Sequence, residues 1–204
     1  MSFRETILHE ALVIFEQNGI EDITTEALIE ALGISRSTLH EIAPSKRNLV
    51  HLCIAHSTKT RKALVENTIA EAEHPLEALL QLLQISIEEV YSFSPAFVHD
   101  LKTYYPRAWM RLQLFMRLLM QGYIQPLMQQ CILQGYLQQQ MSTDLMSRMF
   151  LSQLQGLLDP QLYPTLAFDY NDLFRTIVVF YLRGCATSLG QEHIEEFTSR
   201  AMAV

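Results

Sequence analysis

Apolar residues recur along nearly the whole chain at intervals of three and four positions. That spacing places them on one face of an α-helix, so each such segment predicts a helix with one buried side. No stretch alternates between apolar and polar residues with the period of two that a half-buried strand requires. The pattern therefore predicts an all-α protein of about nine to ten helices.

The N-terminal part of the chain predicts three helices, of which the second and third are short. A hydroxyl residue that can cap a helix precedes each short helix, and a glycine or a proline ends it. Two short helices separated by a tight turn that holds a glycine are typical of a helix-turn-helix. The expected helices cover residues 3–18, the segment from Thr24 or Thr25 to Gly33, and the segment from Ser35 to Pro44.

Beyond Pro44 the pattern predicts longer helices, with no flexible linker between them and the first three. We therefore expect a three-helix head over residues 1–47, with its helix-turn-helix at about 24–43, and a larger helical body over residues 48–204. Pro126 falls inside one long segment and predicts a kink there. The expected helices of the body cover residues 46–73, 76–93, 95–105, 107–133, 143–158 and 170–189, and a short one follows Gln191.

Composition excludes several classes of protein. The chain is 49% hydrophobic and 18% charged, which does not fit a disordered or low-complexity protein. Its longest purely apolar run, residues 177–182, is too short to span a bilayer, and its N-terminal residues lack the pattern of a signal peptide. Cys53, Cys131 and Cys185 are scattered and odd in number, which indicates reduced thiols. We therefore expect a cytoplasmic protein that does not contact a membrane.

The sequence holds no pattern that predicts catalysis or metal binding. It contains no nucleophile elbow, phosphate-binding loop or dinucleotide-binding glycine motif. His51, Cys53 and His56 lie close together, but the two histidines face different sides of a helix, which does not suit a zinc site. His40 and Glu41 begin like a metalloprotease motif, but Pro44 stands where the second histidine belongs. We expect no catalytic residue, no metal and no cofactor.

The second short helix and the turn before it resemble the recognition-helix region of the TetR family of bacterial transcriptional regulators. The family pattern reads Gly-Val-Ser-x-Gly-Thr-Leu-Tyr-x-Tyr-Phe-x-x-Lys, and Gly33, Ser35, Thr38, Leu39 and Lys46 match it in register. The order of the helices along the whole chain is also similar to that family. The resemblance implies a homodimeric repressor that binds double-stranded palindromic DNA with its head. It also implies that a small apolar effector, bound in the body, modulates or releases that DNA.

Helical spacing turns Leu39 and Ile42 of the expected recognition helix into the head and leaves Arg36 and its neighbours facing outward. We expect Arg36 to contact a guanine edge or a phosphate, and the resemblance implies that Lys46 and His40 contact the DNA backbone. The alternative for these side chains is a solvated helix face. The expected DNA contacts are Thr24, Thr25, Ser35, Arg36, Ser37, Thr38, His40 and Lys46.

The body contains two apolar groups of residues with candidate roles. One combines aromatic rings, polar handles and methionines, which suits a pocket for an apolar molecule but also plain core. The other lies on the last two long helices, which resemble the dimerisation pair of the family and could equally pack within one chain. The candidate pocket residues are Phe97, His99, Tyr104, Tyr105, Trp109, Met110, Phe115 and Met116, and the candidate dimer residues are Leu145, Met149, Leu154, Phe174, Ile177, Val178, Tyr181, Gly184 and Cys185.

Three departures from the family lead to an alternative function. His40 replaces a tyrosine, and Ile42 and Ala43 replace an aromatic pair, which predicts a looser attachment of the recognition helix. Residues 1–47 carry four basic and eight acidic side chains, a net charge of −4, within a chain of net charge −7. The alternative is a dimeric interaction module with the same fold whose acidic head no longer binds DNA. An enzyme of a kind that the motifs do not reveal is a more distant third possibility.

Overall fold

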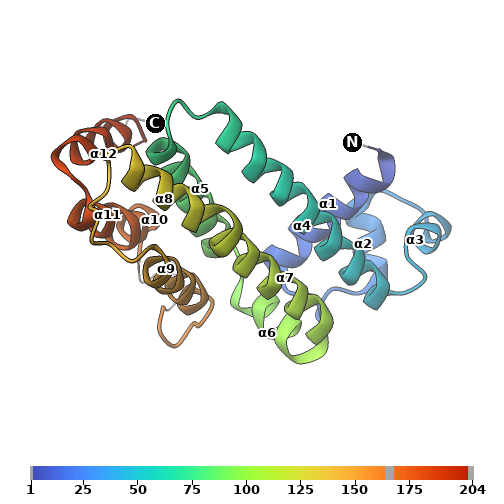
Figure 1. Ribbon diagram of the computed structural model, residues 1–204. Helices are drawn as coiled ribbons and strands as arrows, with labels where there is room; N and C mark the ends of the chain where they lie inside the picture. The colour runs from blue at the N-terminus through green and yellow to red at the C-terminus, as the bar shows by residue number, and fades with distance from the viewer. Residues whose placement is uncertain (1, 164–167, 202–204) are drawn as a thin grey trace. The chain divides into compact units, whose positions relative to one another are not determined.

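The computed structural model describes residues 2–163 and 168–201 of the chain (Figure 1). Within these residues the protein is all-α, and the only pairing of extended backbone is an isolated bridge between Leu137 and Ala186. The fold class predicted from the apolar spacing is therefore confirmed. In the same part of the chain, no helix combines the length and the apolar character needed to cross a membrane.

The chain divides into two compact units. The first unit consists of Met1–Ala63 and Ser92–Phe115, and the second of Leu64–Tyr91 and Met116–Val204. The helix-turn-helix thus shares its unit with helices from the middle of the sequence. The boundary that we expected after residue 47 falls inside a helix, α4 (Lys46–Glu71), which begins in the first unit and ends in the second.

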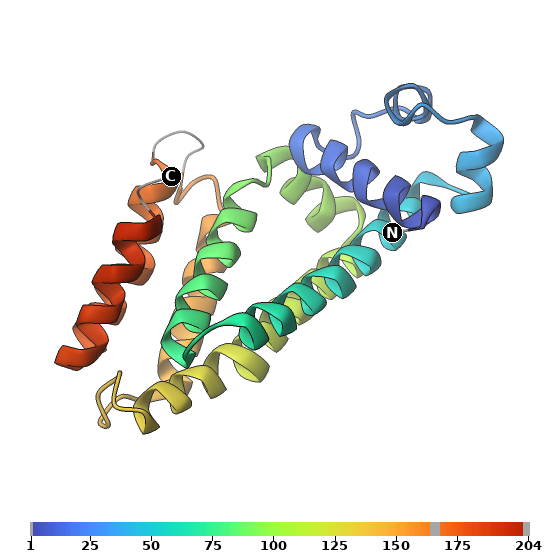
Figure 2. The same cartoon turned by 90° about the horizontal axis from the view of Figure 1, so that it is seen from above.

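The three helices of the head form where their capping residues predict them (Figure 2). They are α1 (Phe3–Asn18), α2 (Thr25–Leu32) and α3 (Arg36–Ile42). The side chains of Thr24 and Ser35 accept hydrogen bonds from the first turns of α2 and α3. Gly33 ends α2 in the left-handed conformation, with φ of 62°, which glycine adopts without strain. Local capping therefore suffices to place the helix-turn-helix.

A core of aliphatic and aromatic side chains joins the head to α6 (Pro95–Tyr104) and the start of α7 (Pro106–Leu119). Phe15 of α1 is fully buried, and Phe97 of α6 is 1% exposed. The polypeptide approaches closely at Gly19, which has φ of 85° and where an added Cβ would lie 2.9 Å from the Cβ of Ala96. Both features require glycine at this point, so α6 packs directly against the turn between α1 and α2.

Charged side chains from two other helices hold the turn between α1 and α2. The buried carboxylate of Asp100 accepts hydrogen bonds from the N–H groups of Ile20 (2.7 Å) and Glu21 (2.8 Å). The Lys46 ammonium, at the start of α4, donates to the carbonyls of Glu21 (3.2 Å) and Ile23 (2.6 Å). Charges of opposite sign therefore satisfy two N–H groups and two carbonyls of the turn. We call this arrangement the turn clamp.

The second unit contains the end of α4, α5 (Pro75–Tyr91), α8 (Gln125–Leu133), α9 (Thr143–Leu157), α10 (Tyr170–Phe174), α11 (Phe180–Cys185) and α12 (Ser188–Ala201). Two π-helical turns, Met120–Ile124 and Arg175–Val179, interrupt the helices on either side of them. The first lies just before Pro126, whose missing N–H weakens the regular hydrogen bonding there. The disruption expected at Pro126 is thus a π-helical turn that precedes it.

The prediction of one helix over residues 170–189 is wrong. The helix ends at Cys185, because Ala186 is extended and pairs with Leu137, and α12 begins at Ser188. The last helix is consequently longer than expected. At Gly190 an added Cβ would lie 2.1 Å from the carbonyl oxygen of Tyr136, so the backbone contact that creates this break also depends on a glycine.

We expect Asp100→Ala to destabilise the protein by about 2–3 kcal/mol, because it leaves two N–H groups without their charged acceptor. The measurement is urea denaturation followed by circular dichroism. Glu10→Ala, at an exposed position of α1, is the matched control and should change stability by less than about 0.5 kcal/mol. Equal stability of the two variants would contradict a structural role for the Asp100 carboxylate.

Candidate nucleic-acid interface

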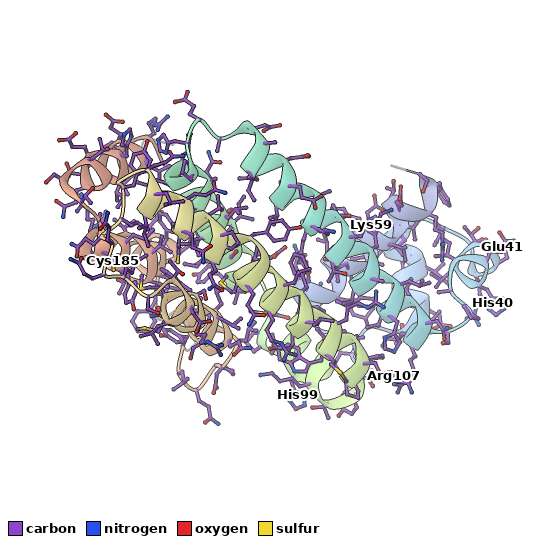
Figure 3. All side chains as sticks on the ribbon, viewed as in Figure 1. His40, Glu41, Lys59, His99, Arg107 and Cys185 are labelled. Carbon is purple, nitrogen blue, oxygen red and sulfur yellow. The ribbon has the colours of Figure 1, made fainter. Side chains whose placement is uncertain are left out.

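The polar side chains on the exposed side of α3 form one continuous strip. Leu39 and Ile42 are buried, whereas Arg36, Ser37, His40 and Glu41 are exposed. Figure 3 shows His40 and Glu41 at the outer edge of the head. The inward and outward assignment made from helical spacing is therefore confirmed, and we call these four exposed residues the reading face.

Three hydroxyl groups gather at the start of α3. The Ser35 Oγ lies 2.7 Å from the Oγ of Ser37 and 2.8 Å from the Oγ1 of Thr38, and it accepts the Thr38 N–H at 3.0 Å. Ser35 therefore acts first as the helix cap. Ser37 is exposed, and hydroxyl groups rotate to suit a new partner, so it is the hydroxyl best placed to meet a phosphate or a base.

Arg36 forms an ion pair that its sequence position does not suggest. Its guanidinium donates to the carboxylate of Glu26, in the first turn of α2, and both side chains are largely exposed, at 73% and 67%. An exposed pair of this kind contributes about 0–1 kcal/mol, so little free energy is needed to break it. The Arg36 guanidinium is therefore accessible to an anionic partner, but Glu26 competes for it.

The other expected contacts lie around the start of α2. The Thr24 Oγ1 accepts the Ala27 N–H at 3.1 Å, and Thr25 is half-buried. The two carbonyls of the turn clamp take two of the three N–H donors of Lys46. Its one remaining donor can still bind an anion. The structure thus brings Lys46 and the two threonines together at one end of α2.

A cavity of about 210 Å³ lies between α2, α3 and the start of α4. Ala43, which stands where the family pattern has phenylalanine, is 4% exposed and borders it. We call this space the head cavity. In the sequence, only the small side chain of Ala43 indicates that this cavity exists. Its lining consists of Thr25, Leu28, Arg36, Leu39, His40, Ala43, Pro44, Ser45, Lys46 and Leu49.

The net charge around the helix-turn-helix is different when it is counted over the compact unit instead of over residues 1–47. The first unit carries ten basic and nine acidic residues, a net charge of +1, and the second carries five and thirteen, a net charge of −8. Partial burial is the largest cause that lowers the pKa of His51, and the positive charges of Arg47, Arg107 and Arg111 lower it further. The acidic head is therefore compensated by basic residues of α4 and α7 in its own unit.

The aromatic residues expected to line a pocket do not share one environment. Phe97, Tyr105 and Met116 are buried, Trp109 and Phe115 are half-buried, and His99, Tyr104 and Met110 are exposed. The Tyr105 hydroxyl donates to Glu21 at 2.8 Å, and burial followed by this hydrogen bond raises the pKa of Tyr105 well above its usual range. Tyr105 thus supports the turn clamp. None of the eight borders the head cavity.

The apolar stripe expected at a dimer interface is divided in two. Leu154, Phe174, Ile177 and Val178 are buried within the single chain and form part of its core. Leu145, Met149 and Gly184 are exposed, and Tyr181 and Cys185 are half-buried. Phe180, one turn before Gly184, is 56% exposed and was not among the candidate dimer residues. The Tyr181 hydroxyl donates to the Met149 sulfur at 2.9 Å and links α11 to α9.

The described residues contain no group of three or more histidine, cysteine or acidic side chains that could hold a metal ion. Burial raises the pKa of the Cys53 thiol to about 12 and that of the Cys131 thiol to about 12. Both cysteines are therefore protonated at neutral pH and serve as apolar core residues.

Residues 7–53 match the model of a family described as bacterial regulatory proteins, tetR family. No curated protein matches the sequence. Solved structures share the fold over nearly the full chain. A gamma-butyrolactone receptor described as ArpA-like is 15% identical, with a TM-score of 0.64, and the match covers 97% of this chain and 95% of that one.

Two further structures are similar to the chain to the same degree. A TetR-family transcriptional regulator from Agrobacterium tumefaciens is 16% identical, with a TM-score of 0.69 and coverage of 90% of this chain and 97% of that one. The ketosteroid transcriptional regulator KstR2 of Mycobacterium tuberculosis is 17% identical, with a TM-score of 0.58 and coverage of 92% and 96%. With the capped helix-turn-helix, these likenesses lead to one conclusion: residues 7–53 match the tetR family of bacterial regulatory proteins, and the chain has the fold of TetR-family transcriptional regulators.

Proposed function

We propose that the protein is a cytoplasmic repressor that binds a palindromic operator as a homodimer and is controlled by a small apolar effector. The observation that carries this proposal is the reading face, held outward on a helix whose cap and buried side are both in place. A net charge of +1 on the unit that contains it favours DNA binding over the interaction module.

Each recognition helix would enter the major groove with the reading face toward the base edges. Arg36 would leave Glu26 and bind a guanine edge, because the two parallel hydrogen bonds formed there are stronger than the exposed ion pair. Lys46, with its one remaining donor, and Ser37 would contact phosphates. Glu41 would accept from a cytosine amino group or discourage a phosphate from approaching at its position.

Dimerisation would use the exposed parts of α9 and α11. Leu145 and Met149 lie one turn apart on α9, and Phe180 and Gly184 lie one turn apart on α11. Two copies of this pair would bury apolar side chains that now face water, in a four-helix arrangement. The two recognition helices would then meet half-sites about 34–36 Å apart.

The effector would bind in the second unit and act through α4, which runs from that unit into the head without interruption. Two solved structures with this fold are of a gamma-butyrolactone receptor and a ketosteroid transcriptional regulator, which supports an apolar or amphipathic effector here. Such a ligand shifts the DNA equilibrium only as far as it prefers one dimer state over the other.

The experiment that tests the proposal is selection of bound sequences from a random pool of duplex DNA at low and at physiological salt. A palindromic consensus that persists at physiological salt is the expected result. Binding with no enriched sequence, or no binding at low salt, would favour the interaction module with an acidic head.

Arg36→Ala should weaken operator binding by about 1–3 kcal/mol per half-site and relax the preference at one base pair. Glu26→Gln is the matched variant, because it removes only the competing carboxylate. It should strengthen binding by up to about fivefold, in line with the small free energy of an exposed ion pair. Fluorescence anisotropy on a panel of operator variants measures both, and uniform weakening by Arg36→Ala would assign that arginine to a backbone contact.

Lys46→Ala should weaken binding to all sequences alike and make the dependence of log Kd on log salt shallower by about two across the dimer. It should also lower the free energy of unfolding by about 1 kcal/mol, because the turn clamp loses its donor. Lys59→Ala, further along α4 (Figure 3), is the control and should change neither quantity. An unchanged salt dependence in Lys46→Ala would show that its ammonium serves the clamp alone.

Gly184→Leu should dissociate the dimer without unfolding the subunit. An added Cβ at Gly184 meets no atom within 4 Å in the single chain, and leucine favours a helix more than glycine does. Sedimentation at several concentrations reports dissociation, circular dichroism reports folding, and DNA affinity should fall in parallel. Gln129→Leu, on an exposed position of α8, serves as the control, and a fully dimeric Gly184→Leu would exclude this surface from the interface.

A further inference from the structure

The head cavity is lined by residues of the helix-turn-helix and the start of α4, which is the part of the protein that we propose reads DNA. The proposed effector, by contrast, binds in the second unit. We propose that it is a second ligand site, which takes a small aromatic carboxylate. The proposal of a binding site rests on the cavity alone, whereas its effect on DNA rests on the function proposed above. The two are tested separately below.

The floor of the cavity is apolar and supplied by all three helices around it. Leu28 of α2, Leu39 of α3 and Leu49 of α4 are 1%, 6% and 1% exposed, and each borders the space. Ala43 also borders the cavity and contributes only a methyl group to its lining. Neighbours of this size do not close on a missing side chain completely, so a space remains that an apolar molecule can fill.

The rim of the cavity is polar and carries positive charge. Arg36 and Lys46 border it, together with the hydroxyl residues Thr25 and Ser45. The carbonyls of Glu21 and Ile23 fix the Lys46 ammonium near the start of α2, with one N–H donor still free. No acidic residue borders the cavity, although Glu26 pairs with Arg36 outside it.

These features select one class of ligand. An apolar floor and a cationic rim require a molecule that is apolar at one end and anionic at the other. The planar guanidinium of Arg36 and the imidazole of His40 favour a flat ring over a branched aliphatic chain, because both stack on aromatic faces. A volume of about 210 Å³ admits a single substituted ring but not a fused steroid-sized skeleton.

Occupation of the head cavity would oppose DNA binding directly. The carboxylate would take the last donor of Lys46, and the ring would occupy the space behind Arg36 and His40 of the reading face. Because binding linkage is reciprocal, DNA would weaken ligand binding by the same factor as the ligand weakens DNA binding.

The test titrates the full-length protein, without DNA, with benzoate and follows the methyl groups of alanine and leucine by NMR. We expect saturable shifts at Ala43, Leu28, Leu39 and Leu49, with Kd of about a millimolar, as befits a ligand of this size. Three matched probes separate the two requirements: acetate lacks the ring, benzyl alcohol lacks the carboxylate, and inorganic phosphate is an anion that lacks both. Each should bind at least about tenfold more weakly than benzoate.

Ala43→Phe fills the cavity and should weaken benzoate binding by about tenfold or more while the circular dichroism spectrum stays helical. If this variant does not fold, Ala43→Leu takes its place. The site is excluded if benzoate produces no saturable shift at these methyl groups, or if a folded filled variant binds as the unsubstituted protein does. Equal binding of acetate or phosphate would show an anion site for the DNA backbone and overturn the assignment to aromatic carboxylates.

The effect on DNA is measured in a second titration, in which benzoate competes with an operator obtained from the pool selection. Binding of benzoate without any loss of DNA affinity would overturn the competition and leave the ligand site standing. Absence of DNA binding under all conditions would overturn the proposed function, and the methyl shifts would still report the cavity.

Discussion

The turn clamp is the constraint on which the reading face depends. The six residues between α1 and α2 leave several peptide groups outside the helical hydrogen bonding, and buried peptide groups without partners are costly. Asp100 satisfies the N–H groups of Ile20 and Glu21, and Lys46 satisfies carbonyls of the same turn. Since α2 begins directly after this turn, and Glu26 in its first turn pairs with Arg36 of α3, helices α4 and α6 hold the end of α2 that adjoins the recognition helix.

The clamp also explains why the compact unit does not end with the helix-turn-helix. Asp100 lies 79 positions from Glu21 in the sequence, so the turn is closed by a helix that the sequence assigns to the body. The additional basic residues of α4 and α7 come with it and offset the acidic charge of the head. Net charge computed over residues 1–47 therefore describes a segment of sequence rather than the folded surface that a phosphate backbone would meet.

Local chemistry predicted the head well because caps act over three or four residues. Ser35 and Gly33 mark the ends of α3 and α2 as clearly in the sequence as in the structure. The end of α11 was missed because its cause is not local: Ala186 pairs with Leu137, and Gly190 accommodates the carbonyl of Tyr136. The period of the apolar stripe also cannot separate its members by role, since a helix face buried by its own chain and one left for a partner show the same period.

In the proposed DNA complex, the weak pair between Arg36 and Glu26 would affect selectivity. It was missed in the sequence because the two residues are ten positions apart on different helices. The exposed pair is worth about 0–1 kcal/mol, whereas a bidentate contact with guanine discriminates by about 1–3 kcal/mol. In that complex, a single phosphate contact would give Arg36 little more free energy than its pair with Glu26 already provides, so the arginine would gain substantially only at the correct base. The pair would therefore lower affinity for non-specific DNA more than it lowers affinity for the operator, which raises the ratio between the two.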